Sequence, residues 1–217
     1  MTHRILHIQA SPRMESYSSR LAKAFLDAYL AAHPQSGLET LNVFLADLPP
    51  FEAPAAAAKY AVMEGQEPRN EAQRAWKEVI RVADQFKSAN MVVVSSPMWN
   101  FGIPYKLKQY IDILVQPGLT FQYVPGEGYK GLVTGRPAVL LLARGGEYPP
   151  DTAGEKFDMQ KPYLEMILRF IGFTDIRAII TENTLAGGPQ VAEENITKAI
   201  AQTKELAKQI PEPVTAA

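Results

Sequence analysis

The 217-residue chain contains no cysteine, and this absence excludes disulfide bonds, cysteine nucleophiles and thiolate metal sites. No apolar run approaches the roughly 20 residues of a membrane-spanning helix, and the apolar part of the first segment is too short for a signal peptide. A formal net charge of −1 leaves no excess of basic residues for nucleic acid or an anionic membrane. We therefore expect a soluble, cytoplasmic protein with no metal site and no nucleic-acid or membrane partner.

Short β-branched runs alternate with amphipathic segments along the chain, which predicts one α/β domain over residues 1–210 and a frayed tail, 211–217. Strands are predicted at 5–8, 38–44, 91–94, 137–143 and 176–180. Helices are predicted at 21–32, 55–63, 71–87, 105–114, 161–171 and 190–209. This alternation is typical of a five-stranded parallel sheet in a three-layer fold, with helices on both faces and right-handed crossovers. The expected strand order is 2-1-3-4-5.

The segment 95–104 follows the third predicted strand and precedes a helix that begins just after Pro104. In open α/β sheets, ligands bind at the carboxyl ends of the strands. Met98, Trp99 and Phe101 supply flat or flexible apolar surface there, and Asn100 adds a polar group. The segment is therefore a candidate site for a flat aromatic ligand.

The first strand ends in a hydroxyl-rich loop, with Ser11, Ser16 and Ser18 ahead of a helix. Hydroxyl groups and unpaired N–H groups at a helix start can bind a phosphate. The alternative is that one serine simply caps the helix. Neither a P-loop nor a GxGxxG motif is present here, which argues against a dinucleotide held in Rossmann fashion.

The fourth strand ends in Arg144-Gly145-Gly146, where paired glycines allow close backbone approach to a ligand; a plain turn is the alternative. All three candidate loops are expected at one edge of the sheet. His7 lies inside the first strand, and we interpret it as a structural histidine rather than a ligand. The connection 47–69 either covers the site or is a surface loop. The irregular segment 115–135, with Phe121 and Tyr129, needs cover for its aromatic surface.

These segments resemble the flavodoxin-like family of FMN-dependent NADH:quinone oxidoreductases and azoreductases. The similarity extends over nearly the whole chain and rests mainly on 97–104 and 118–121, with support from the serine loop and 144–146. The resemblance implies a homodimer that binds FMN, with NADH or NADPH as hydride donor and quinones or azo compounds as acceptors. The strand order 2-1-3-4-5 is also that of flavodoxin, which binds FMN at the switch point between strands 1 and 3.

By this resemblance, FMN is held from three sides. The phosphate contacts are Ser11, Ser16, Tyr17 and Ser18; the ring contacts are Pro97, Met98, Trp99, Asn100 and Phe101; the pyrimidine contacts are Ala143, Arg144, Gly145 and Gly146. The expected walls of the acceptor pocket are Phe101, Phe121, Tyr129, Tyr148 and Phe173, although core packing is an equal alternative for Phe173.

Three positions depart from some relatives. Trp99 replaces a tyrosine and keeps the stacking area, Ala143 replaces a serine and removes a hydroxyl group, and Tyr148 replaces a histidine near the acceptor. No side chain is expected to act as a catalyst, because flavin N5 carries the chemistry. The expected reaction is a ping-pong hydride transfer from NAD(P)H to a quinone or azo compound.

Two other functions stay open. An FMN-binding electron carrier would pass electrons to protein partners, but such carriers tend to be strongly acidic and this chain is nearly neutral. A flavin-free binding module would use the same loops only structurally.

Overall fold

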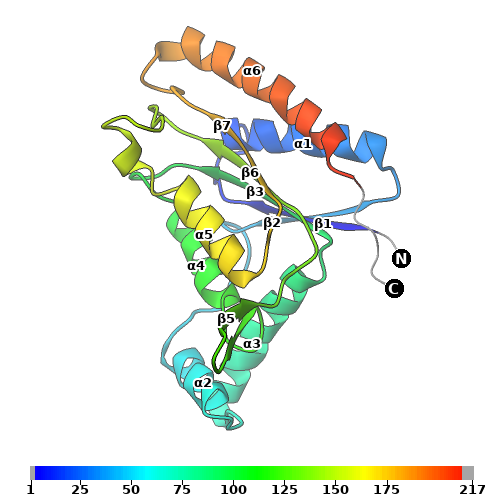
Figure 1. Ribbon diagram of the computed structural model, residues 1–217, viewed down its shortest axis with the longest axis vertical. Coiled ribbons are helices and arrows are strands. Elements are labelled where there is room, and N and C mark those ends of the chain that lie inside the picture. The colour runs from blue at the N-terminus through cyan, green and yellow to red at the C-terminus, as the bar shows by residue number, and fades with distance from the viewer. Residues whose placement is uncertain (1–2, 212–217) are drawn as a thin grey trace.

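Five parallel strands form the central sheet of the computed structural model, which describes residues 3–211. In sheet order they are β2 (Gly37–Asn42), β1 (Arg4–Gln9), β3 (Met91–Pro97), β6 (Ala138–Ala143) and β7 (Ile176–Thr181). Counted along the chain, this is the predicted order 2-1-3-4-5, and every neighbouring pair is parallel. All five strands therefore end at one edge of the sheet, called the carboxyl edge below (Figure 1).

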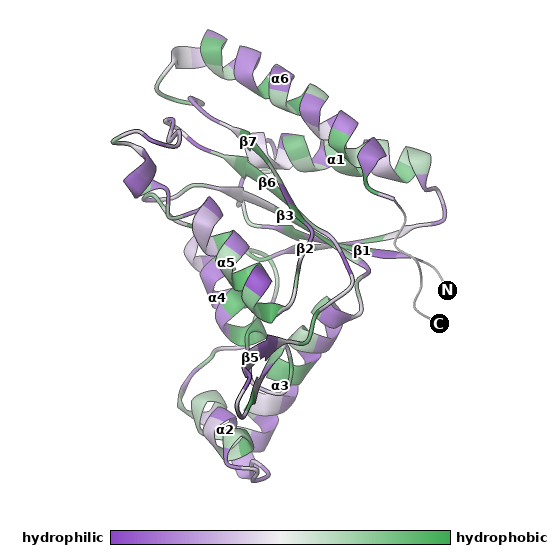
Figure 2. Ribbon diagram, in the orientation of Figure 1, coloured by the Kyte–Doolittle hydropathy of each residue, from purple (hydrophilic) through white to green (hydrophobic). Residues whose placement is uncertain are grey.

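Helices cover both faces of the sheet (Figure 1). α1 (Tyr17–Ala32) and α6 (Gly188–Gln209) pack together on one face, and α3 (Asn70–Lys87), α4 (Tyr105–Leu114) and α5 (Lys161–Ile171) lie on the other, with α2 (Ala53–Met63) against α3. The two layers follow from strand alternation: Val93 enters the core beneath α1, and Val94 enters the core on the opposite face. Figure 2 shows the apolar strands of the sheet between these layers and the mixed polar and apolar surfaces of the helices.

Most predicted elements agree with the structure, and the differences lie at their ends. α1 begins at Tyr17, ahead of the predicted Leu21, because the Ser16 hydroxyl group caps it by accepting the Ser19 N–H. β3 continues to Pro97, since Ser95 and Ser96 are buried and paired with β6. α6 begins at Gly188 rather than at residue 190. The predicted frayed tail lies almost wholly outside the described residues, which end at 211.

The segment 115–135 is not simply irregular, and this corrects the prediction. It contains an antiparallel hairpin of β4 (Phe121–Val124) and β5 (Gly128–Gly131). Gly131 lies directly on Gly172, where an added Cβ atom would be 2.2 Å from the Gly172 nitrogen. The hairpin therefore packs against the turn after α5. That turn precedes β7, so the hairpin lies at the edge of the sheet opposite to the carboxyl edge (Figure 1).

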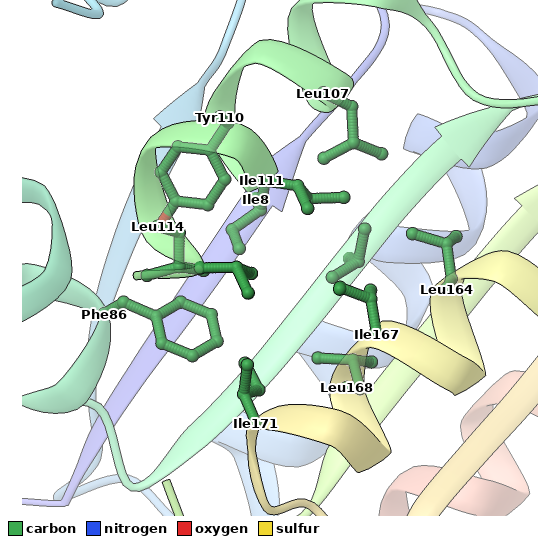
Figure 3. A pocket seen from close by; sticks show the side chains of 12 residues that line it. Ile8, Phe86, Leu107, Tyr110, Ile111, Leu114, Leu164, Ile167, Leu168 and Ile171 are labelled. Carbon is green, nitrogen blue, oxygen red and sulfur yellow. The ribbon is translucent and has the colours of Figure 1, made fainter. Parts of the chain in front are cut away.

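A small apolar cavity of about 30 Å³ lies between α4, α5 and the sheet. Figure 3 shows side chains from α4, including Leu107 and Ile111, facing Leu164 and Leu168 of α5 across it. Aliphatic and aromatic side chains line it, and apolar cavities stay dry. We interpret it as a packing defect of the core and not as a ligand site.

Two kinds of feature are absent from residues 3–211. No helix there combines the length and the apolar character needed to cross a bilayer. No group of three or more histidine, aspartate or glutamate side chains there is arranged to hold a metal ion.

Candidate functional site

A cleft of about 240 Å³ opens at the carboxyl edge, where the loops after β1, β3, β6 and β7 meet. The strand register explains the meeting, because Gln9 pairs with Ser95 and Pro97 pairs with Ala143. The predicted cofactor residues that line the cleft are Ser11, Ser16, Tyr17, Ser18, Pro97, Met98, Trp99, Ala143 and Gly145. The three predicted loops therefore form one site.

The serine loop forms the part of the cleft nearest the start of α1. The Ser16 Oγ atom accepts the Ser19 N–H at 3.2 Å and lies 3.2 Å from the Ser18 Oγ atom. The Ser11 Oγ atom accepts the Arg13 N–H at 3.2 Å. Hydroxyl groups, first-turn N–H groups and the helix dipole thus surround one end of the cleft, and the dipole favours an anion by about 0.3–1 kcal/mol. Ser16 is both a helix cap and a cleft residue, so the two alternatives for this serine are compatible.

The loop after β3 is a strained tight turn. Trp99 and Gly102 exchange two backbone hydrogen bonds, at 3.0 and 2.9 Å. Between them, Asn100 and Phe101 both have positive φ angles, 47° and 68°. A non-glycine residue held there costs on the order of 1–3 kcal/mol, and such strain concentrates at functional sites. The turn places the Trp99 indole at the rim of the cleft. The ring centroids of Trp99 and Phe44 are 5.6 Å apart.

The loop after β6 offers backbone donors. The carbonyl groups of Gly145 and Gly146 accept N–H groups from the segment after β7, including Asn183 and Leu185. Within residues 3–211, no backbone or side-chain acceptor takes the N–H group of either glycine. A Cβ atom added to Gly145 would lie 3.0 Å from the Leu185 Cδ1 atom. The loop is held by its carbonyl groups, and its N–H groups remain available to a ligand.

Four predicted cofactor residues lie outside the lining of this cleft. Asn100 lines a neighbouring cleft of about 740 Å³, on the side of Trp99 that faces α4. Phe101 and Gly146 lie beside the first cleft without lining it. Arg144 is buried, and its guanidinium group pairs with Asp158 and Glu182.

The five predicted acceptor residues lie in three different places. Phe101 meets Tyr148 edge-on at a centroid distance of 6.3 Å, beside the cleft. Phe121 and Tyr129 lie on the hairpin and contact Phe170 of α5, at the opposite edge of the sheet. Phe173 is 2% exposed and packs against Phe86, which favours the core-packing alternative for this residue over a pocket wall.

The sequence analysis missed four cleft residues, which are Pro12, Arg13, Thr184 and Leu185. The last two follow β7, and the rule that located the other loops applies equally to the fifth strand. Arg13 is exposed beside the serine loop and has no ion-pair partner among residues 3–211. It is therefore an exposed cation at the serine-loop end of the cleft.

His7 is a satisfied strand histidine outside the cleft. Its Nε2 atom lies 2.9 Å from the Ser95 Oγ atom, and its Nδ1 atom lies 3.5 Å from the Thr40 Oγ1 atom. Burial lowers the pKa of His7 from 6.5 to about 4. The imidazole is therefore neutral at physiological pH and contributes hydrogen bonds rather than charge.

Comparison with known proteins agrees with this geometry. A family model described as "Flavodoxin-like fold" matches residues 3–207. The chain is 50% identical over 205 residues to the FMN-dependent NADH:quinone oxidoreductase of Nitratidesulfovibrio vulgaris, covering 94% of this chain and 97% of that protein. It is 43% identical over 207 residues to the protein of the same name from Desulfotalea psychrophila, again covering 94% and 97%.

Solved structures give the same result. The azoreductase from Bacillus anthracis strain Sterne superposes with a TM-score of 0.87 at 30% identity, covering 96% of this chain and all of the other. An FMN-dependent NADH-azoreductase from strain Ames Ancestor, solved in complex with FMN, superposes with a TM-score of 0.85 at 28% identity, covering 95% and 98%.

Proposed function

Because the chain belongs to the flavodoxin-like family of FMN-dependent NADH:quinone oxidoreductases, we propose that it is a flavoenzyme that uses NADH or NADPH to reduce quinones and aromatic azo compounds. One observation carries the proposal. The serine loop, the Trp99 turn and the Gly145-Gly146 turn converge on one cleft at the carboxyl edge of the sheet, at the switch point where flavodoxin-like folds bind their cofactor.

The residues present fit FMN on the chemistry of their donors. Ser11, Ser16 and Ser18, with the first turn of α1 and the nearby Arg13, would hold the phosphate. Met98 and Trp99 offer an apolar and aromatic surface to the rings. The N–H groups of Gly145 and Gly146, which are free of acceptors in residues 3–211, match the carbonyl-rich pyrimidine edge. Ala143 supplies no hydroxyl group there, so backbone donors would make these bonds.

Bound FMN would supply the redox chemistry, taking a hydride at N5 and reducing the acceptor in ping-pong order. The protein's part is to bind, orient and exclude water. The glycine N–H groups would stabilise negative charge on the pyrimidine edge without a formal acid. No histidine or carboxylate is among the described residues that line the cleft, so protons for the acceptor would come from water.

Flat acceptors would stack beside Phe101 and Tyr148. Phe101 is half exposed, and the Tyr148 ring meets it edge-on. The Phe157 ring centroid lies 5.1 Å from that of Phe101, so three aromatic rings cluster next to the cleft. We call Phe101, Tyr148 and Phe157 the aromatic shelf.

A homodimer would bring in the remaining aromatic residues. Tyr123 and Tyr129 are more than 60% exposed on the hairpin, and the hairpin cannot reach its own cleft from the opposite edge of the sheet. Exposed aromatic clusters of this kind favour burial in an interface. We propose that the hairpin's aromatic residues, with Phe121, contribute to a site only across two subunits. Light scattering coupled to size-exclusion chromatography tests the dimer.

An electron carrier remains the second candidate, favoured only by the fold. One experiment separates the two. The purified protein is mixed with FMN, and its absorbance spectrum is followed during anaerobic addition of NADH and then NADPH. Rapid bleaching by either nucleotide, with parallel double-reciprocal lines for a quinone acceptor, supports the oxidoreductase. Failure to bleach, with dithionite reducing the bound flavin in two separate one-electron steps, supports the carrier; a colourless protein that does not retain FMN contradicts both.

A further inference from the structure

Arg144 is the most completely buried arginine at the carboxyl edge, with 2% of its surface exposed. It follows β6 directly, yet its side chain turns away from the cleft. The Nη2 atom lies 2.7 Å from the Asp158 Oδ2 atom and the Nη1 atom 3.1 Å from the Glu182 Oε1 atom, while the Nε–H donates to the Gln160 Oε1 atom at 3.2 Å. All three nitrogen atoms of the guanidinium group are therefore engaged within the protein.

Each side chain that pairs with Arg144 also makes a hydrogen bond to another segment at the carboxyl edge or at the start of α5. The Gln160 side-chain amide donates to the Ser96 carbonyl oxygen at 3.2 Å, at the end of β3. The Glu182 carboxylate accepts the Tyr148 N–H at 3.1 Å. The Asp158 Oδ1 atom accepts the Gln160 N–H at 3.0 Å, at the start of α5. One guanidinium group thus connects the ends of β3, β6 and β7 to the segment that precedes α5.

The same group supports the aromatic shelf. The Arg144 guanidinium carbon lies 5.7 Å from the centre of the Tyr148 ring, within cation–π range. The Met159 N–H, next to Asp158, donates to the Phe101 carbonyl oxygen at 2.9 Å. Phe101 is held at a positive φ angle of 68°, and such a conformation persists only where its surroundings fix it. The network supplies that fixation.

We propose that Arg144 is a positioning residue for acceptor reduction, which acts through Asp158, Gln160 and Glu182 and touches neither cofactor nor acceptor. This inference rests on the proposed function and replaces the sequence-based placement of Arg144 against the flavin. The network sets the Gly145-Gly146 turn and the aromatic shelf relative to each other. Loss of one partner lets the shelf move while the cleft itself remains.

The test uses the FMN-loaded protein with a soluble benzoquinone as acceptor and compares Arg144→Lys, Asp158→Asn and Glu182→Gln with the wild type. Arg177→Lys is the matched control, because Arg177 makes an ion pair with Asp175 at the other end of β7. Four quantities are measured: the FMN dissociation constant, kcat and KM for the quinone, the visible circular dichroism of the bound flavin, and Tm.

We expect Asp158→Asn and Glu182→Gln each to lower kcat/KM for the quinone about tenfold or more, since a displacement of about 1 Å misaligns the reacting groups. The flavin dichroism should change. The FMN dissociation constant should stay within about threefold, because the serine loop is untouched and the Gly145-Gly146 turn keeps its carbonyl bonds to the segment after β7. Arg144→Lys, which keeps the charge but cannot make three directed bonds, should behave alike. Arg177→Lys should change none of these.

Two outcomes overturn the positioning role. Variants that lower only Tm, with unchanged kcat/KM for the quinone and unchanged dichroism, would make the network purely structural. An Arg144→Lys variant that loses FMN, beside Asp158→Asn and Glu182→Gln variants that retain it, would mean that Arg144 contacts the flavin directly. If Arg144→Lys does not fold, the two carboxylate variants decide the question alone. A wild-type protein that neither binds FMN nor oxidises NADH refutes the proposed function instead.

Discussion

Acid should destabilise this protein through one buried group, His7. The imidazole lies between β2 and β3, 2.9 Å from the Ser95 Oγ atom and 3.5 Å from the Thr40 Oγ1 atom. Both neighbours are uncharged. A separate surface cleft that His7 lines also contains Glu15, Arg20, Lys23 and Asp27, which are two acidic and two basic side chains. Burial therefore decides its ionisation and lowers its pKa to about 4.

The magnitude follows from proton linkage. Above pH 6.5, His7 is neutral in the folded and unfolded states and its ionisation does not affect stability. Below pH 6.5, His7 binds a proton in the unfolded chain but stays neutral in the folded protein. The free energy of unfolding therefore falls as the pH decreases towards about 4. Each pH unit in this window costs about 1.4 kcal/mol, which gives about 2 kcal/mol between pH 6.5 and pH 5.

The variant His7→Gln tests this prediction, because glutamine keeps a donor and an acceptor but does not titrate. Free energies of unfolding are measured by urea denaturation at pH 7.5 and pH 5.0 for the wild type, for His7→Gln and for His33→Gln. His33 lies at the carboxyl-terminal cap of α1. The pH-dependent loss should shrink by about 2 kcal/mol in His7→Gln only. Equal losses in all three proteins would refute the assignment of acid sensitivity to this buried imidazole.

Three further predictions concern the cleft and the core. Arg13→Ala should weaken FMN binding about two- to fivefold at low salt and less at high salt, as for an exposed ionic contact. Quenching of flavin fluorescence measures the FMN dissociation constant, and an unchanged affinity would mean that Arg13 does not contact the phosphate. Tyr110→Phe should leave the unfolding free energy unchanged or raise it by about 1 kcal/mol, because the buried hydroxyl group has no partner in residues 3–211; a loss above 1 kcal/mol would contradict this. Gly131→Ala should cost about 3 kcal/mol, since its Cβ atom would meet the Gly172 backbone at 2.2 Å, and a neutral effect on urea denaturation would show that the hairpin is not anchored there.

The central strands could be predicted because their residues are buried on both faces. Val92, Val93 and Val94 form a continuous apolar run whatever their neighbours are. The end of β3 could not be located from such a run, because Ser95 and Ser96 are polar. Both are nevertheless fully buried, paired with Leu141 and Leu142 of β6. Their position depends on a strand that lies more than 40 residues later in the chain.

The hairpin was missed for a different physical reason. Its strands contain four residues each, and no residue of either strand is fully buried. Each strand is therefore too short for its alternation of apolar and polar residues to be distinguished from a glycine-rich loop. Its anchors, Phe170 and Gly172, belong to α5 and the turn that follows it. The contacts that define the hairpin are not local in sequence.

The location of the site followed from topology, whereas the direction of individual side chains did not. Parallel strands must end at one edge, so loops after strands 1, 3 and 4 were bound to meet there. Arg144 shows the limit of that rule. Its backbone position was predicted, but its side chain turns towards Asp158 and Glu182, which are 14 and 38 residues away. No local pattern indicates that choice.

Backbone and side chains have different proposed roles in the cleft. The proposed contacts to the pyrimidine edge come from N–H groups of Gly145 and Gly146, which no side-chain substitution removes. The loss of a hydroxyl group at Ala143 is therefore tolerable. The proposed acceptor surface, in contrast, consists of side chains at Phe101 and Tyr148, and the orientation of Phe101 depends on a strained turn. Substitutions on the aromatic shelf should accordingly change which acceptor is reduced, while cofactor binding stays nearly constant.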